Sequence, residues 1–396
     1  MPGPVQARRC LLGALLLIGS AQVAAGAEPD QQAALARLFR AERIEPGWLA
    51  PDFLTAVPLA QVQELVGALK RRHGALRSVV ERDGRLVVVL DGAEVPARLS
   101  LDGEGRIAVL LLEPPVDVSR GLEEQVAAIA GLPGRTSVLV ASDGQPVAMH
   151  EPDALLAVGS AGKLPILKAV DQAVRAGRLA WDQVVPLDPA WRSLPGGILQ
   201  DWPDDTPVTI ATLAGLMISV SDNTATDALL DLVGRPAVEQ LAPRNVPFPS
   251  TREMFVLKSS SAAGLRAAWR RSDPSGRREL LRSIADRPLP AAEELQVEPT
   301  LEVEWFFTAR ELCGLLEETA DLAPFRIQPG PADPRRWRQV AFKGGSEAGV
   351  LNLSTLVEDE EGRRHCVVAS WNGEAGLEPE RLLGPYRAIL HALGRS

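Results

Sequence analysis

The chain has 396 residues, of which 46% are hydrophobic, and a formal net charge of −9 at neutral pH. This length and composition suffice for one large hydrophobic core or two ordinary ones, which excludes a disordered tail or a fibre. The acidic balance, without a long run of basic residues, argues against nucleic acid or anionic lipid as a partner, so we expect a small-molecule partner.

The first 27 residues have the three-part layout of a secretory signal peptide. Two arginines precede an apolar segment over 10–18, and small residues lead up to Ala27. The apolar segment is too short to span a bilayer, and Cys10 begins it instead of following it, which argues against a lipid anchor. We therefore expect cleavage near Ala27, no stable membrane insertion, and a periplasmic or secreted mature chain.

Residues 28–112 predict a small α+β domain. Apolar residues recur three and four apart over 31–44 and 58–76, which predicts two helices. Alternating segments separated by Asp-Gly and Gly-Glu-Gly turns follow and predict an antiparallel meander. Two adjacent prolines then predict a linker over 113–121.

The second predicted domain covers 122–396. It opens with a helical segment and a hairpin that turns at Asp143-Gly144. Helical patterns dominate to about residue 325, and three strand patterns and an amphipathic helix over 378–393 close the chain. Strands at both ends predict one antiparallel sheet flanked by helices, with an all-helical subdomain beside it, an α+β (α/β) fold class.

The cysteines and histidines give little sign of a metal. Cleavage would leave Cys313 and Cys366, which an oxidising compartment could pair; a buried free thiol at each position is the alternative. The four histidines are scattered without metal-ligand spacing. We expect no metal, no other cofactor and a monomer.

The first motif that carries chemistry is Ser-Ala-Gly-Lys at 160–163. A phosphate-binding loop would need glycine and a hydroxyl residue where the chain has Ala157 and Leu164. A nucleophile elbow would need glycine in place of Val158. Both interpretations are therefore excluded.

The segment after this motif predicts a helix that places Ser160 at its N-terminus and Lys163 one turn further on. Free N–H groups and the helix dipole favour a developing negative charge there. A lysine can act as a general base when burial or a second cation lowers its pKa, whereas arginine cannot. The structural alternative is a small-residue helix start that arises by chance.

The second motif is Ser221-Asp222-Asn223, between two predicted helices bounded by Thr209 and Gly234. A functional interpretation makes Ser221 a proton relay to the leaving group and Asn223 a ligand of a substrate amide. The structural alternative is a polar turn between two helices.

The third motif is Lys-Gly-Gly-Ser at 343–346, where a predicted strand ends. Strand glycines allow a substrate to lie against the backbone and receive N–H hydrogen bonds. Lys343 would supply a second cation that keeps Lys163 neutral. The structural alternative is a strand that ends in a turn.

Together, the three motifs in this order resemble the penicillin-recognising serine hydrolases, namely class A β-lactamases and the related D,D-peptidases. The resemblance implies a β-lactamase/transpeptidase-like fold with the active site between the sheet and the helical part. It implies the following roles: Ser160 as acylated nucleophile, Lys163 as its base, Ser221 as proton shuttle, Asn223 as substrate-amide ligand, Lys343 as electrostatic anchor, Gly345 as a substrate contact, Ser160 and Ser346 N–H as the oxyanion hole, and Asp222 as a structural cap.

Two departures from the family pattern concern substrate binding and turnover. Gly344 stands where the family has a hydroxyl residue that binds the β-lactam carboxylate, a role left to Ser346. The family's deacylating glutamate has one candidate here, Glu253, and Leu257 replaces the asparagine expected after it. Alternatively, Glu253 is a solvated or Arg-paired carboxylate, and turnover is then slow.

We expect an exported serine hydrolase that forms an acyl-enzyme on Ser160 with a β-lactam, an ester or a cell-wall peptide. The alternatives are a D,D-carboxypeptidase or esterase, and a penicillin- or peptidoglycan-binding protein without efficient turnover. Residues 28–112 look like the cone-shaped nuclear-transport-factor/steroid-isomerase fold, and we expect them to form a non-catalytic accessory domain.

Overall fold

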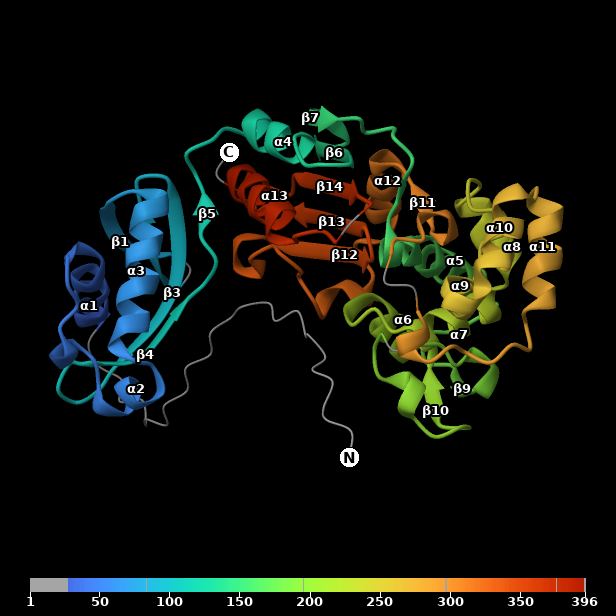
Figure 1. Cartoon of the computed structure of the whole chain (residues 1–396), viewed down its shortest axis with the longest axis horizontal. Coiled ribbons are helices and arrows are strands. Elements are labelled where there is room, and N and C mark those ends of the chain that lie inside the picture. The colour runs from blue at the N-terminus through green and yellow to red at the C-terminus, as the bar shows by residue number, and fades with distance from the viewer. Residues whose placement is uncertain (1–27, 83, 195, 296–297, 375, 395–396) are drawn as a thin grey trace. The chain divides into compact units, whose positions relative to one another are not determined.

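The computed structural model describes residues 28–396 except 83, 195, 296–297, 375 and 395–396. The expected signal peptide lies outside the described residues. Contacts within the chain divide it into two compact units, one that ends at Gly121 and one that begins at Leu122 (Figure 1). Among the described helices, none combines the length and the apolar character that a membrane span requires.

The first unit packs its helices against an antiparallel sheet of order β1-β2-β3-β4, with β5 paired to β3. Its core lies between apolar side chains of the helices and the inward face of the strands. The elements are α1 (Glu28–Arg40), α2 (Pro51–Ala56), α3 (Leu59–His73), β1 (Leu76–Arg82), β2 (Arg85–Leu90), β3 (Ala93–Leu101), β4 (Ile107–Leu112) and β5 (Val116–Asp117).

Two features of the first unit differ from the sequence prediction. The short helix α2 lies between the two predicted helices and begins at Pro51, which suits a first helical turn. The predicted linker over 113–121 contains β5, which pairs with Ala93 and Glu94. After the prolines interrupt β4, the chain resumes pairing along the same side of β3, so the predicted linker contains a short strand. The division between the two units falls after Gly121.

The second unit is built on an antiparallel sheet of order β12-β13-β14-β6-β7, so the predicted sheet assembled from both ends of the unit is confirmed. Helices α4 and α13 cover one face, and α12 packs on the other face beside the helical part (Figure 1). The mixed fold class predicted from the sequence is confirmed. The strands are β6 (Arg135–Ser142), β7 (Gln145–His150), β8 (Leu156–Ala157), β9 (Val184–Pro186), β10 (Pro207–Thr209), β11 (Phe306–Phe307), β12 (Gln339–Glu347), β13 (Val350–Glu358) and β14 (Arg364–Asn372).

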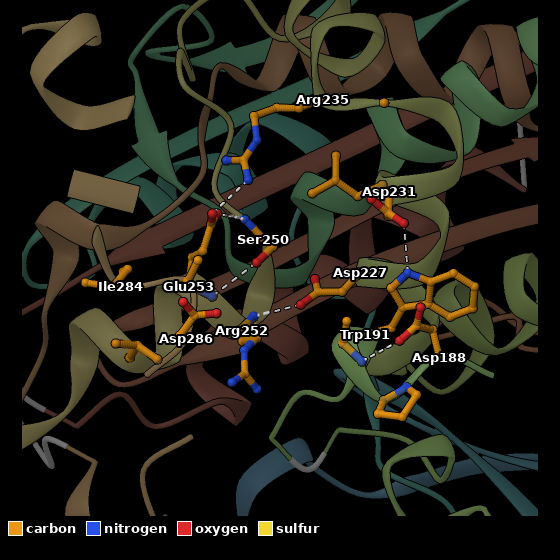
Figure 2. Close-up of a pocket in the computed structure, with 16 residues that line it drawn as sticks. Asp188, Trp191, Asp227, Asp231, Arg235, Ser250, Arg252, Glu253, Ile284 and Asp286 are labelled. Atoms are coloured by element: carbon orange, nitrogen blue, oxygen red, sulfur yellow. Dashed lines mark hydrogen bonds and ion pairs between the residues drawn. The ribbon is translucent and has the colours of Figure 1, made fainter. Parts of the chain in front are cut away.

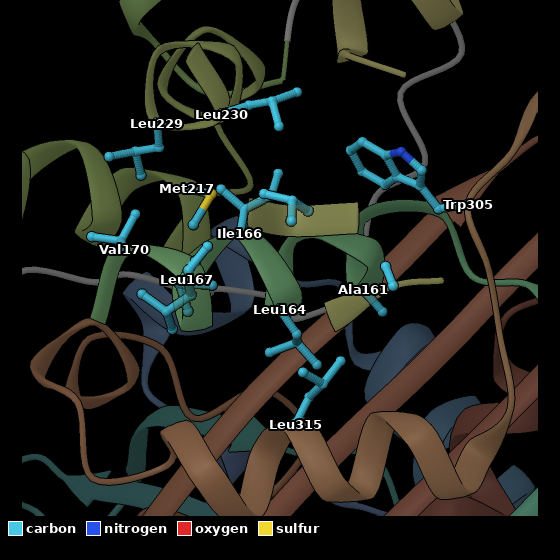
Figure 3. Packing of buried hydrophobic residues seen from close by; sticks show 14 of the residues in the cluster. Ala161, Leu164, Ile166, Leu167, Val170, Met217, Leu229, Leu230, Trp305 and Leu315 are labelled. Atoms are coloured by element: carbon cyan, nitrogen blue, oxygen red, sulfur yellow. The ribbon is translucent and has the colours of Figure 1, made fainter. Parts of the chain in front are cut away.

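The helical part is organised around one helix, α5, which is apolar on most of its surface. Its side chains meet those of α6, α7 and α12 in a continuous core, and Figure 3 shows Leu164 beside Leu315 and Ile166 beside Met217. This burial fixes the N-terminal end of α5 in place. The helices are α4 (Leu122–Ala130), α5 (Leu164–Arg175), α6 (Ile210–Ser219), α7 (Asn223–Val233), α8 (Arg235–Leu241), α9 (Thr251–Lys258), α10 (Ala263–Arg271), α11 (Pro274–Ser283), α12 (Ala309–Thr319) and α13 (Glu380–Leu393).

A disulfide joins the helical layer to the sheet. Cys313 on α12 and Cys366 on β14 are bonded, with an S–S distance of 1.99 Å. Of the two possibilities left open by the sequence, the structure has the paired cysteines.

Candidate active site

Ser160 lies in a one-turn 3-10 helix, η2 (Gly159–Lys163), that runs directly into α5. The strand before it is held by Asn372, whose side chain bonds both backbone groups of Ala157, at 2.8 and 2.9 Å. Pro165 falls in the first turn of α5, where a missing N–H costs nothing. The residues on either side of Ser160 are buried while Ser160 itself is partly exposed. Its hydroxyl is therefore presented from a rigid support.

Gly162 has a packing role that the sequence did not reveal. A Cβ atom there would lie 2.4 Å from the Trp305 ring, so only glycine lets the two approach. Trp305 stacks on Phe248 and donates from Nε1 to Pro249 O at 3.1 Å, while its own carbonyl accepts from Val158 N at 3.0 Å. Glycine at position 162 thus lets residues 158–163 pack directly against the Trp305 ring. We call this segment the nucleophile loop because the sequence predicts Ser160 as the nucleophile.

The Lys163 side chain is fully buried and its amine is surrounded by oxygen acceptors from the second motif. Nζ donates to Ser221 O at 2.6 Å, to Ser221 Oγ at 3.1 Å and to Asn223 Oδ1 at 2.7 Å. In the described part of the chain no hydrogen bond involves the Ser160 hydroxyl. The amine is therefore anchored on the second motif, one turn away from a hydroxyl that is free to face a ligand.

Burial lowers the pKa of Lys163 to about 7, although the negative charges of Asp227, Asp222 and Glu347 oppose this effect. Near neutral pH a large share of the molecules therefore carries an uncharged amine at this position. An uncharged lysine amine is a general base, and a base is most effective when its pKa lies near the working pH.

The second motif forms a tight junction between α6 and α7. Ser221 has a positive φ of 60°, an uncommon conformation for a side-chain-bearing residue that concentrates at functional sites. Asp222 caps α7 by accepting from Ala225 N at 2.8 Å, and it also accepts from Ile198 N and Leu199 N. Asp222 thus caps α7, as the resemblance implies.

Two glycines that sequence analysis passed over support this junction. A Cβ on Gly197 would lie 2.2 Å from Asp222 Oδ2, and one on Gly196 would lie 2.7 Å from Asn223 Nδ2. The glycine pair lets its loop lie against the second motif. Asn223 Nδ2 donates to Leu194 O at 3.3 Å, so its amide is engaged on both ends within the protein. Its predicted role as a substrate ligand stays a prediction.

The third motif lies on β12 and touches the nucleophile loop through backbone atoms. A Cβ on Gly345 would lie 2.0 Å from Val158 O and 2.5 Å from Ser160 N, and one on Gly159 would lie 3.3 Å from Ser346 N. Glycine at 345 therefore permits the loop and the strand to meet. This approach brings together the backbone N–H groups of Ser160 and Ser346, the pair named above as an oxyanion hole.

Lys343 is buried on the same face of β12 as Gly345. Burial lowers the pKa of Lys343 well below its usual range, and the nearby charge of Lys163 lowers it further. The charge of Lys163 therefore disfavours protonation of Lys343. The predicted effect in the other direction, in which Lys343 keeps Lys163 neutral, stays a prediction.

A side chain at position 344 would crowd the Phe342 ring. A Cβ there would lie 2.9 Å from Phe342 Cζ and 3.1 Å from Asn352 O. The Phe342 ring is itself packed against Gly330, where a Cβ would lie 2.2 Å from the ring. The aromatic ring thus fills the space that a side chain at 344 would need.

Glu253, the sequence candidate for a deacylating base, is occupied by structural bonds. Its carboxylate accepts from Ser250 N at 2.7 Å in a capping box of α9 and pairs with Arg235 at 2.8 Å (Figure 2). It lines a pocket of about 710 Å³ with other acidic residues, and Ser160 is not among the pocket's lining residues. Of the two interpretations, the structure supports an Arg-paired carboxylate.

An acid that sequence analysis missed lies one turn into α7. Asp227 is buried and accepts from Thr251 N and Arg252 N, at 2.7 and 2.8 Å. Burial raises the pKa of Asp227 to about 6.

Within the described residues no group of three or more His, Cys, Asp or Glu side chains is arranged to hold a metal ion.

Comparison with known proteins gives a family match for part of the chain. The model of the β-lactamase enzyme family matches residues 121–266, which contain the first two motifs and not the third. No curated protein matches the chain. Over 121–266 the chain is therefore similar to the β-lactamase family of serine hydrolases.

Solved structures give matches at low sequence identity. A β-lactamase from Sphaerobacter thermophilus is 24% identical with a TM-score of 0.49, covering 69% of this chain and 97% of that one. PBP-A is 17% identical with a TM-score of 0.48, covering 69% and 96%. A β-lactamase from Desulfarculus baarsii is 19% identical with a TM-score of 0.47, covering 69% and 98%.

Proposed function

We propose that this protein is an exported serine hydrolase that forms an acyl-enzyme on Ser160 with a lactam, amide or ester. One observation carries the proposal. The Lys163 amine is buried, has a pKa of about 7, and is held by Ser221 and Asn223 one turn from the Ser160 hydroxyl. A neutral amine in this position is what activation of a serine without histidine requires.

We propose the following acylation step. Lys163 Nζ takes the proton from Ser160 Oγ, which bonds to the substrate carbonyl carbon. The N–H groups of Ser160 and Ser346 stabilise the negative oxygen of the tetrahedral intermediate. The bond between the carbonyl carbon and the leaving nitrogen or oxygen then breaks. Lys163 passes its proton to that leaving atom through Ser221 Oγ, which lies 3.1 Å from Lys163 Nζ.

We propose β-lactams, esters and cell-wall peptides as the substrate classes, and the site lacks a strong anchor for a β-lactam carboxylate. Gly344 offers no hydroxyl, and the hydroxyl of Ser346 is the nearest substitute on β12. We infer that hydrolysis of β-lactams is weak. Export is supported by the N-terminal sequence and by the Cys313–Cys366 disulfide, since disulfides persist in oxidising compartments.

Two further functions stay open to test. One is a D,D-carboxypeptidase or esterase with the same acyl-enzyme. The other is a penicillin- or peptidoglycan-binding protein that acylates without efficient turnover, which the engagement of Glu253 with Arg235 and Ser250 favours.

Intact-mass measurement during incubation with benzylpenicillin and with a p-nitrophenyl ester separates these functions. A transient adduct indicates hydrolysis, and a persistent adduct indicates a binding protein. The absence of an adduct with both reagents would overturn the acyl-enzyme proposal.

A further inference from the structure

Three charged side chains that acylation does not use form a cluster at the end of β12. Lys258, the last residue of α9, hydrogen-bonds Glu304 Oε1, and its Nζ lies 3.6 Å from Glu347 Oε2. Lys258 and Glu304 are buried, whereas the Glu347 side chain is 34% exposed. We refer to these residues as the Lys258 cluster.

The Lys258 cluster is connected to the nucleophile loop through β12 and through Trp305. Glu347 follows Ser346 and, because strand side chains alternate, shares the face of β12 with Lys343 and Gly345. That face meets the loop, since a Cβ on Gly345 would lie 2.5 Å from Ser160 N.

Glu304 is connected to the same loop through its sequence neighbour Trp305. It precedes Trp305, whose carbonyl accepts from Val158 N at 3.0 Å and whose ring seats Gly162. The charge of Glu347 is also felt at the Lys163 amine, where it opposes the lowering of the pKa. Glu347 is therefore electrostatically coupled to Lys163.

The balance of charge in the Lys258 cluster leaves it able to accept a proton. One lysine faces two carboxylates, and although burial alone would lower the pKa of Lys258, the charges of Glu304 and Glu347 raise it. Burial raises the pKa of Glu304 to about 7, against the opposing effect of Lys258. Of the three side chains, that of Glu347 is partly exposed, so its carboxylate can meet water.

We propose that Glu347 is the general base of deacylation and that Lys258, held by Glu304, positions its carboxylate. This inference rests on the acyl-enzyme proposed above. It replaces Glu253, whose carboxylate oxygens both have partners elsewhere.

The proposed step balances in atoms and charge. Glu347 takes one proton from a water molecule as the water oxygen bonds to the acyl carbonyl carbon. Glu347 passes this proton to the neutral amine of Lys163. The protonated amine then donates it to Ser160 Oγ as the bond between Oγ and the acyl carbon breaks. The product is the free acid, and the serine, the lysine and the glutamate return to their starting states.

A purely structural role for the Lys258 cluster makes a different prediction. If it only fixed the end of β12, its loss would displace the Ser346 N–H and slow acylation and deacylation alike. A base of deacylation affects the second step alone. The ratio of the two rates therefore separates the two roles.

The experiment uses the full-length protein and follows the Ser160 adduct of benzylpenicillin and of a p-nitrophenyl ester by mass. We expect Glu347→Gln to hold the adduct about 100-fold longer, a typical loss for a general base. Its acylation rate should be unchanged when the two proteins are compared well above pH 7, where Lys163 is neutral with or without the Glu347 charge. Glu347→Asp, which keeps the charge with a shorter reach, should give an intermediate lifetime. Glu361→Gln, at an exposed turn, is the matched control and should equal the unaltered protein.

The positioning role has its own readout. Lys258→Met should lengthen the adduct lifetime, and Lys258→Arg should restore part of the deacylation rate because it keeps the charge. An unchanged lifetime in both Glu347 variants, or an equal slowing of both steps, would overturn this inference while leaving the acyl-enzyme intact. A protein that forms no Ser160 adduct would instead overturn the proposed function, and this inference with it.

Discussion

Lys163 Nζ donates a hydrogen bond to Asn223 Oδ1 at 2.7 Å, across 60 residues of sequence. This bond joins the N-terminal end of α5 to the start of α7 and holds a buried amine without a carboxylate in direct contact. A buried lysine that bonds only to neutral oxygens loses hydration without gaining a full counter-charge, so its uncharged form is favoured. The proposed chemistry depends on this relationship.

Replacement of the lysine by a permanent cation should stop acylation. We expect Lys163→Arg to lose about 10²-fold or more of the acylation rate, because arginine does not give up its proton at ordinary pH. The rate of adduct formation by mass measures this effect. Lys168→Arg, at a half-buried position on α5 that pairs with Glu318, serves as the control, and equal rates in the two variants would argue against a base at 163.

The pH dependence of acylation should follow the same amine. The pKa of Lys163 is lowered to about 7, so the amine is mostly protonated below that pH and mostly neutral above it. We therefore expect the acylation rate to rise with pH through about 7 and then to level off. A rate that is flat between pH 5 and 9, a range chosen to bracket a pKa near 7, would contradict the assignment.

Gly162→Ala should destabilise the protein by about 1–3 kcal/mol, the usual cost of overpacking. The added Cβ would lie 2.4 Å from the Trp305 ring, so either the ring or the nucleophile loop must shift. Chemical denaturation measures the change in the free energy of unfolding. Gly314→Ala on α12, where a Cβ meets nothing within 4 Å, is the control and should be neutral or stabilising; similar losses in both variants would count against this packing.

A stable protein with a hydroxyl residue at position 344 should require a second substitution, at Phe342. Gly344→Thr alone should lose stability, because its Cβ would lie 2.9 Å from Phe342 Cζ. The double variant Gly344→Thr with Phe342→Ala makes room and should acylate faster with benzylpenicillin than Phe342→Ala does. Thermal unfolding tests the loss of stability in Gly344→Thr, and the rate of adduct formation tests the double variant. A Gly344→Thr variant as stable as the unaltered protein would show that Phe342 does not prevent a side chain at 344.

Reduction of the disulfide should lower the stability of the second unit. Cys313 and Cys366 are 53 residues apart, and closing a loop of that length constrains the unfolded chain by about 4 kcal/mol at most. Thermal unfolding of the Cys313→Ser, Cys366→Ser double variant should show a lower midpoint that no longer responds to reductant. A midpoint equal to that of the unaltered protein would contradict a stabilising bond.

The sequence predicted the features that depend on local pattern. Periodicity and turn residues gave the sheet built from both ends of the second unit, and Thr209 and Gly234 flank the helices around the second motif as expected. The strand β5 was missed because its pairing depends on space left along β3.

The other features of the candidate site depend on contacts between segments far apart in the sequence, and a local sequence pattern does not encode such contacts. The seat of Gly162 on Trp305 and the approach of Gly345 to Ser160 N join parts of the chain far apart in sequence. Glu253 was proposed from its distance to the second motif along the chain, whereas its bonds to Arg235 and Ser250 are visible only in three dimensions. The same holds for the Lys258 cluster.

Peptide mapping of the adduct decides whether Ser160 is the nucleophile. The unaltered protein and Ser160→Ala are treated with a p-nitrophenyl ester and with benzylpenicillin, quenched in acid, digested and analysed by mass. We expect the acyl group on the peptide that contains Ser160 and no acyl group on the variant. A label on another residue, or one that survives in Ser160→Ala, would contradict this expectation.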